Sequence, residues 1–218
     1  MTEHYPEKCA VVLPSFRAAE AFKRAYARLH VGPCRLPEVM TLGAFMEGRG
    51  DAEYQIADPL EVLATLFAVQ LKEEGGREGF DRYLNWGPVA LADFHAVDHY
   101  ELDAAQVFKN LKDIKDIEDW SFGEEKVLSE DQKRFSEQWS RLLPLYNSLH
   151  STLEKKGLIT KARKSRNICS TGDTGHYDKI FAAGLAAITV AERKYLLKWD
   201  AVGKLSMIWD ADLSYVDD

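Results

Sequence analysis

The sequence predicts an α/β fold in which both chain ends build one parallel sheet and the middle forms a large all-helical insertion. Short apolar runs lie near the two ends, at residues 9–13, 179–184 and 205–209. Runs of this length and composition are typical of strands buried on both faces of a parallel sheet. Residues 58–157 instead show helical periodicity and contain no clear strand. We therefore expect an α/β core from residues 1–57 and 158–218, with residues 58–157 as a helical subdomain.

The first strand and the helix after it form the most informative stretch. Cys9 to Leu13 is uncharged and too short for a helix, and Pro14 ends the strand because it cannot donate a ladder hydrogen bond. Ser15 can cap a helix over 16–29, whose apolar residues recur with helical spacing. Free N–H groups at such a helix start attract anions, and Arg17 would strengthen the attraction. An ordinary strand–helix unit without a ligand is the alternative.

The next elements follow from turn and capping signals. An extended piece over 36–41 leads into a helical turn through Met46, and Asp58 and Pro59 begin the first helix of the insertion. Further helices are expected over 80–100, over 103–118 and from Ser129 onward. Pro144 lies inside the last of these and predicts a kink or a break.

The last sixty residues return to α/β character. A helix is expected over 158–169, and its basic residues form a second positive cluster made of Lys161, Arg163, Lys164 and Arg166. A solvated helix face is the alternative for this cluster. A capped helix over 189–199 then separates the last two strands.

Composition indicates a soluble cytoplasmic protein. Its 218 residues are 46% hydrophobic and 29% charged, and no apolar run approaches the roughly 20 residues that cross a bilayer. The first residues lack the pattern of a signal peptide. Cys9, Cys34 and Cys169 are widely spaced and are expected to be reduced thiols.

The net charge of −7 is concentrated in the middle of the chain. Residues 51–157 carry 12 basic against 22 acidic side chains, a balance of −10, while both ends are near neutral. A phosphate backbone would be repelled by the acidic middle, so if the protein contacts nucleic acid, the contact is expected at the ends.

Motifs for catalysis are few. No glycine-rich phosphate loop precedes a Lys-Ser/Thr pair, so ATP binding is not expected, and no cofactor is expected either. His95 and His99 are spaced as metal ligands on a helix would be, which leaves a metal-dependent hydrolase as an alternative function. The glutamate that would act as a base is missing because residue 96 is Ala. The other interpretation of this stretch, which includes Asp93 and Asp98, is a solvated acidic turn.

Several stretches resemble a known family. Val-Val-Leu-Pro-Ser-Phe-Arg-Ala-Ala (11–19) and Leu-Pro-Glu-Val-Met-Thr-Leu (36–42) are similar to the N-terminus of Bacteroidetes-type PD-(D/E)XK nuclease family proteins. These are relatives of the AddB/RecC subunits of helicase–nucleases. The stretches that agree in order further along the chain are 86–98, 106–113 and 181–192.

The resemblance implies a P-loop-NTPase fold of the superfamily 1 helicase type, acting in repair of DNA double-strand breaks. Pro14, Ser15 and Arg17 would match the helicase motif that touches the DNA backbone, and a helicase subunit would be the protein partner. The phosphate loop of active relatives is absent, and the PD-(D/E)XK motif is not found in these residues. The expected function is therefore non-catalytic, with weak, sequence-independent DNA binding. A pure protein-interaction module is a third interpretation of the same residues.

Overall fold

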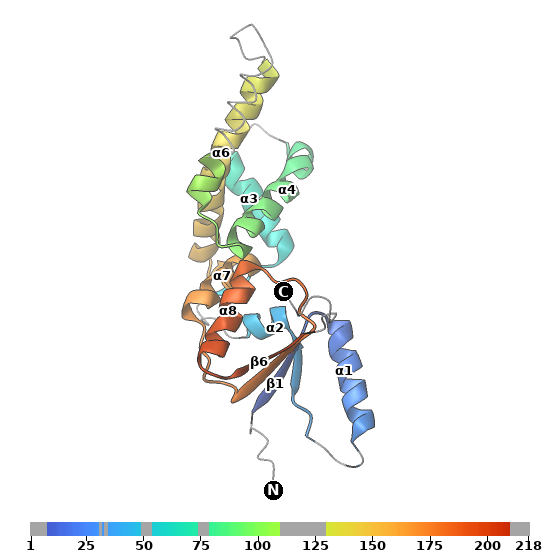
Figure 1. Cartoon of the computed structure of the whole chain (residues 1–218). Coiled ribbons are helices and arrows are strands. Elements are labelled where there is room, and N and C mark those ends of the chain that lie inside the picture. Colours follow the sequence, from blue (N-terminus) through green and yellow to red (C-terminus); the bar gives the residue numbers. More distant parts are fainter. Residues whose placement is uncertain are drawn as a thin grey trace, which may run out of the picture. The chain divides into compact units, whose positions relative to one another are not determined.

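The chain forms two compact units, 1–51 with 164–218 and 52–163, which are described here separately (Figure 1). The structure is a computed structural model that describes residues 8–30, 32, 35–48, 54–73, 79–109 and 130–209, with side chains from residue 141 in the last range. Within these ranges, no helix combines the length and the apolar character needed to cross a membrane.

The first unit is built on a four-stranded parallel sheet. Its strands are β1 (Cys9–Leu13), β2 (Glu38–Thr41), β5 (Lys179–Ala183) and β6 (Leu205–Ile208), in the order β2-β1-β5-β6. In the register of the sheet, Val11 lies between Val39 on one side and Phe181 on the other. The expected α/β class and the parallel sheet from both chain ends are thus confirmed.

Helices cover the two faces of this sheet unequally. On one face, α2 (Leu42–Glu47) and α8 (Val190–Ala201) bury the larger core, in which Phe45 and Trp199 are fully buried beside Val12. On the other face, α1 (Phe16–Leu29) covers β1 mainly through Ala19. Because side chains alternate along a strand, neighbouring residues of β1 serve different cores.

The second unit is mainly helical, with α3 (Pro59–Glu73), α4 (Phe80–His99), a helical stretch over 104–109 and α6 (Glu130–Lys155). Their shared core centres on the fully buried Leu66, Tyr83, Phe94 and Leu149. The helix predicted over 103–118 is found over 104–109, and its remainder lies outside the described residues. Of the kink or break predicted at Pro144, the break is wrong because α6 continues through this residue. Packing of the apolar side of α6 outweighs the roughly 3 kcal/mol that an interior proline costs.

The helix predicted over 158–169 is also corrected. Leu158 and Ile159 form β4, which pairs in parallel with β3 (Gln55–Ile56) before α7 (Lys161–Thr171) begins. Gly157 has φ +72°, a conformation that ends a helix readily. The Thr160 hydroxyl then accepts a hydrogen bond from the Arg163 amide at 3.1 Å, which caps α7 three residues later than predicted.

Candidate functional site

The turn between β1 and α1 has the geometry that the sequence predicts. Ser15 is the N-cap of α1, and its side chain accepts a hydrogen bond from the Ala18 amide at 3.2 Å. The Ala19 amide donates to the Ser15 carbonyl at 3.0 Å. The amides of Phe16 and Arg17 precede these bonds and have no intrahelical acceptor, as in any first turn. The turn therefore offers two N–H groups at the positive end of the helix dipole.

Pro14, Ser15 and Arg17 are all exposed, so the structure brings these three predicted residues together on the surface. They lie at the carboxyl edge of the sheet, where the loop after β5 begins at Gly184. A Cβ atom on Gly184 would lie 3.9 Å from the Pro14 ring, so the two loops are immediate neighbours.

This position is a switch point in the sheet topology. The connection from β1 runs to β2 over the face that α1 covers, whereas β5 lies on the other side of β1 and leads into α8 on the opposite face. In open α/β sheets, ligands bind outside the carboxyl ends of the strands at such a point. The topology therefore favours this edge as a ligand site.

The second predicted cluster, on α7, has a different character. Lys161 is exposed, while Arg163, Lys164 and Arg166 are half-buried. Arg163 is engaged by the protein itself, since its Nη1 atom lies 3.3 Å from Oδ1 of Asp98. The four residues therefore do not form a single exposed basic face.

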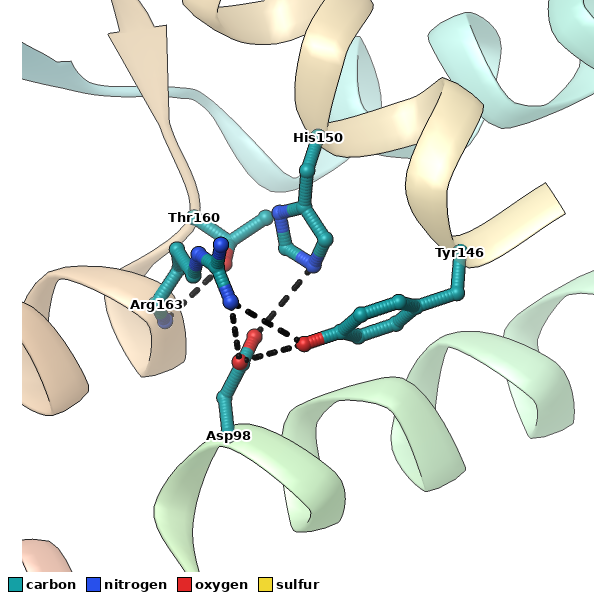
Figure 2. A network of polar contacts seen from close by, with 5 residues as sticks. All are labelled: Asp98, Tyr146, His150, Thr160 and Arg163. Atoms are coloured by element: carbon teal, nitrogen blue, oxygen red, sulfur yellow. Dashed lines mark hydrogen bonds and ion pairs between the residues drawn. The ribbon is translucent and has the colours of Figure 1, made fainter. Parts of the chain in front are cut away.

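Asp98 is the centre of a buried polar network (Figure 2). This aspartate is 0% exposed, and its Oδ1 also accepts a 2.7 Å hydrogen bond from the Tyr146 hydroxyl. Its Oδ2 lies 3.3 Å from Nε2 of His150, and Arg163 donates to the Tyr146 oxygen at 3.2 Å. Thr160 lies beside the group as the cap of α7. The network joins α4, α6 and the first turn of α7.

The network keeps Asp98 ionised. Burial alone would raise the pKa of this carboxyl, but the hydrogen bond and charge of His150, the Tyr146 hydroxyl and the Arg163 guanidinium together lower it below its ordinary value. The side chain of Arg163 is 28% exposed, and the other four residues are buried. A substrate could not reach this Asp–His pair, so the arrangement serves the fold and not acid–base chemistry.

His95 and His99, the metal candidates, lie half-buried on α4 near Asp98. Among the residues that the structure describes, the Nε2 atom of His95 and the Nδ1 atom of His99 are buried without a hydrogen-bond partner. Burial is the main cause that lowers the pKa of His95, followed by the charge of His99. In the described part of the chain, no three His, Cys, Asp or Glu side chains are grouped to hold a metal ion.

The interpretation of residues 93–103 as a solvated turn is wrong for Asp98. A periodic signal could have shown this, because Leu91, Phe94 and Asp98 are spaced i, i+3 and i+7 and so share the buried face of α4. Tyr146 and His150 are spaced i and i+4 on α6 and likewise share one face. The sequence signal of such a network is a charged residue on the otherwise apolar face of one helix, together with polar aromatic residues on the apolar face of another helix.

These features stand without support from relatives: no family model matches the chain, and no curated protein sequence matches it either.

Proposed function

We propose that this chain is a non-catalytic, helicase-like region of a DNA double-strand-break repair protein, and that its β1–α1 turn binds the DNA backbone. The observation that carries the proposal is the exposed Arg17 beside the two open amides at the start of α1. Backbone N–H groups and a guanidinium are the donors that phosphate oxygens accept most readily.

The location of the turn supports the same proposal. It lies at the carboxyl edge of a parallel sheet, at the switch point between β1 and β5. The Ser15 oxygen accepts the hydrogen bond of the Ala18 amide, which leaves the hydroxyl hydrogen to be donated to a phosphate. Contacts of this kind position a strand without reading its sequence. The proposal also includes a helicase subunit as the protein partner. This part rests on the resemblance of residues 11–19 and 181–192 to the nuclease family named above.

The test is fluorescence anisotropy with a labelled single-stranded oligonucleotide at low salt. We expect dissociation constants of roughly 10⁻⁴ to 10⁻⁶ M, typical of non-specific binding, and weaker binding after Arg17→Ala with unchanged sequence preference. Arg82→Ala is the matched control because Arg82 is also exposed near the start of a helix, α4, but lies in the acidic unit.

Equal binding by wild type and Arg17→Ala would refute the role of the turn. Calorimetry with ATP tests the non-catalytic part, for which we expect no binding at millimolar nucleotide. Micromolar ATP affinity would contradict it, and zinc bound in a stoichiometric amount and lost on mutation of His95 would favour the hydrolase instead.

A further inference from the structure

The outward face of α1 carries a line of three arginines, Arg17, Arg24 and Arg28. All three are exposed, while the residues that turn toward the sheet, Ala19, Phe22 and Tyr26, are buried or half-buried. At 100° per residue, the three arginines fall within about 40° of one another, opposite the packed side. The line therefore begins at the proposed DNA-binding turn and runs along the helix.

The line of arginines is long enough to contact more than one phosphate group. Arg17 and Arg28 are eleven residues apart, which is about 16 Å along the axis at 1.5 Å per residue. Arg24 lies between them, seven residues from the first and four from the last. The spacing presents three guanidinium groups in a row, each reaching from the same side of the helix.

Among the described residues, none of the three arginines forms an ion pair. The one acidic residue of α1, Glu20, lies beside the line and is paired with Lys23 at 2.9 Å. A run of guanidinium groups that have no ion pair in the described part of the chain fits a ligand with negative charges repeated along its length.

We propose that a single nucleic-acid strand follows α1, with three of its phosphates bound by Arg17, Arg24 and Arg28. This inference rests on the proposed function, because Arg17 is shared, and it adds the path of the strand and two further binding residues. An anionic membrane is the other polyanion that a basic helix can meet. A strand is favoured because Ala19 and Phe22 of α1 pack on the sheet and are not available to enter a bilayer.

The experiment compares the double variant Arg24→Ala/Arg28→Ala with wild type in salt titrations of oligonucleotide binding. Each lost phosphate contact lowers the log–log salt slope by about 0.7 on single strands, so the slope should fall by about 1.4. The same loss weakens binding about tenfold or more at low salt. The control Lys72→Ala/Arg82→Ala removes two exposed positive charges from the other unit and should leave the slope unchanged.

A second variant, Arg24→Lys/Arg28→Lys, keeps the charges and should retain the salt slope. An unchanged slope in the alanine double variant, with binding still weakened by Arg17→Ala, would overturn this inference and leave the proposed function standing. If both the alanine double variant and Arg17→Ala bind the oligonucleotide as well as wild type, the inference and the proposed function are both overturned. Wild-type binding to phosphatidylserine vesicles that the alanine double variant loses would also overturn the inference. Alanine favours a helix, and circular dichroism checks that each variant is folded.

Discussion

The β1–α1 turn and the Asp98 network use polar groups in opposite ways. At the turn, Ser15 and Arg17 are exposed, and the hydrogen bond of Ser15 serves only the start of one helix. In the network, Asp98 is fully buried, and its partners come from two other helices. An exposed group contributes little to folding and stays available to a ligand, whereas a buried one is held by its partners in the fold.

Two arginines, one from each region, make the same point. Arg17 and Arg163 both lie in the first turn of a helix and both belong to positively charged stretches of sequence. Arg163 faces a buried carboxylate and is held by it, while Arg17 has no such neighbour among the described residues. The carboxylate that a fold places opposite a basic residue, more than the local density of charge, decides whether that residue stays available to a ligand.

The largest effect should follow from Asp98→Ala in the helical unit. The substitution leaves the guanidinium of Arg163 and the ring of His150 without their shared anion. Removing one partner of a buried ion pair costs about 3–5 kcal/mol, and the partial exposure of Arg163 places our expectation at about 3 kcal/mol. Urea unfolding of the whole chain, followed by far-ultraviolet circular dichroism, measures the change.

Asp93→Ala is the matched control for that measurement. Asp93 is exposed on the same helix and should change the free energy of unfolding by less than about 0.5 kcal/mol. If Asp98→Ala is as mild as Asp93→Ala, the network does not hold α4 to α6 and α7, and the contrast with the turn disappears.

A smaller effect is expected from Ser15→Ala at the exposed turn. The change removes the acceptor of the Ala18 amide and should cost about 1 kcal/mol, as is usual for an N-cap serine. Ser15→Gly should cost only a few tenths, because glycine suits the cap backbone and leaves it open to water. The same urea experiment separates the two. A loss for Ser15→Ala as large as that for Asp98→Ala would show that the turn contributes as much to the stability of the fold as the network does.

Local signals predict the sheet well because residues that end a strand or cap a helix lie next to its elements in the sequence. Pro14 ends the strand that runs from Cys9 to Leu13. Thr189 caps α8, the helix before β6, and its capping box with Glu192 is visible in the sequence. Such signals lie within a few residues of the element they define. They also place Ser15 and Arg17 correctly on one exposed turn.

The network could not be predicted in the same way because its members are far apart in the chain. Asp98 contacts residues 48, 52 and 65 positions away, and no local rule links a carboxylate to a distant arginine. The short strand β4 is missed for a similar reason, since Leu158 and Ile159 become a strand only by pairing with Gln55 and Ile56. Two-residue strands have no periodicity to detect.

The smallest expected effect is a pH dependence that arises from His95, beside the network. Burial, with the charges of His99 and His150, lowers the pKa of His95 in the folded state, although Asp98 acts in the opposite direction. A lowered pKa means that the unfolded chain binds the proton more readily, so stability is complete above the unfolded pKa of 6.5 and declines as pH falls below it. The folded pKa of Asp98 is also lowered, so its contribution to stability is lost only as pH falls below the ordinary value of 3.8. Asp98 therefore does not change the stability between pH 7 and pH 5. We therefore expect the free energy of unfolding to fall over that interval in wild type and to fall less in His95→Gln, which cannot take up the proton.

Urea unfolding at pH 7, 6 and 5 measures how steeply the free energy of unfolding falls with pH in wild type and in His95→Gln. Parallel slopes would show that His95 titrates as it does in water, and that the buried region around Asp98 ends before it reaches this histidine.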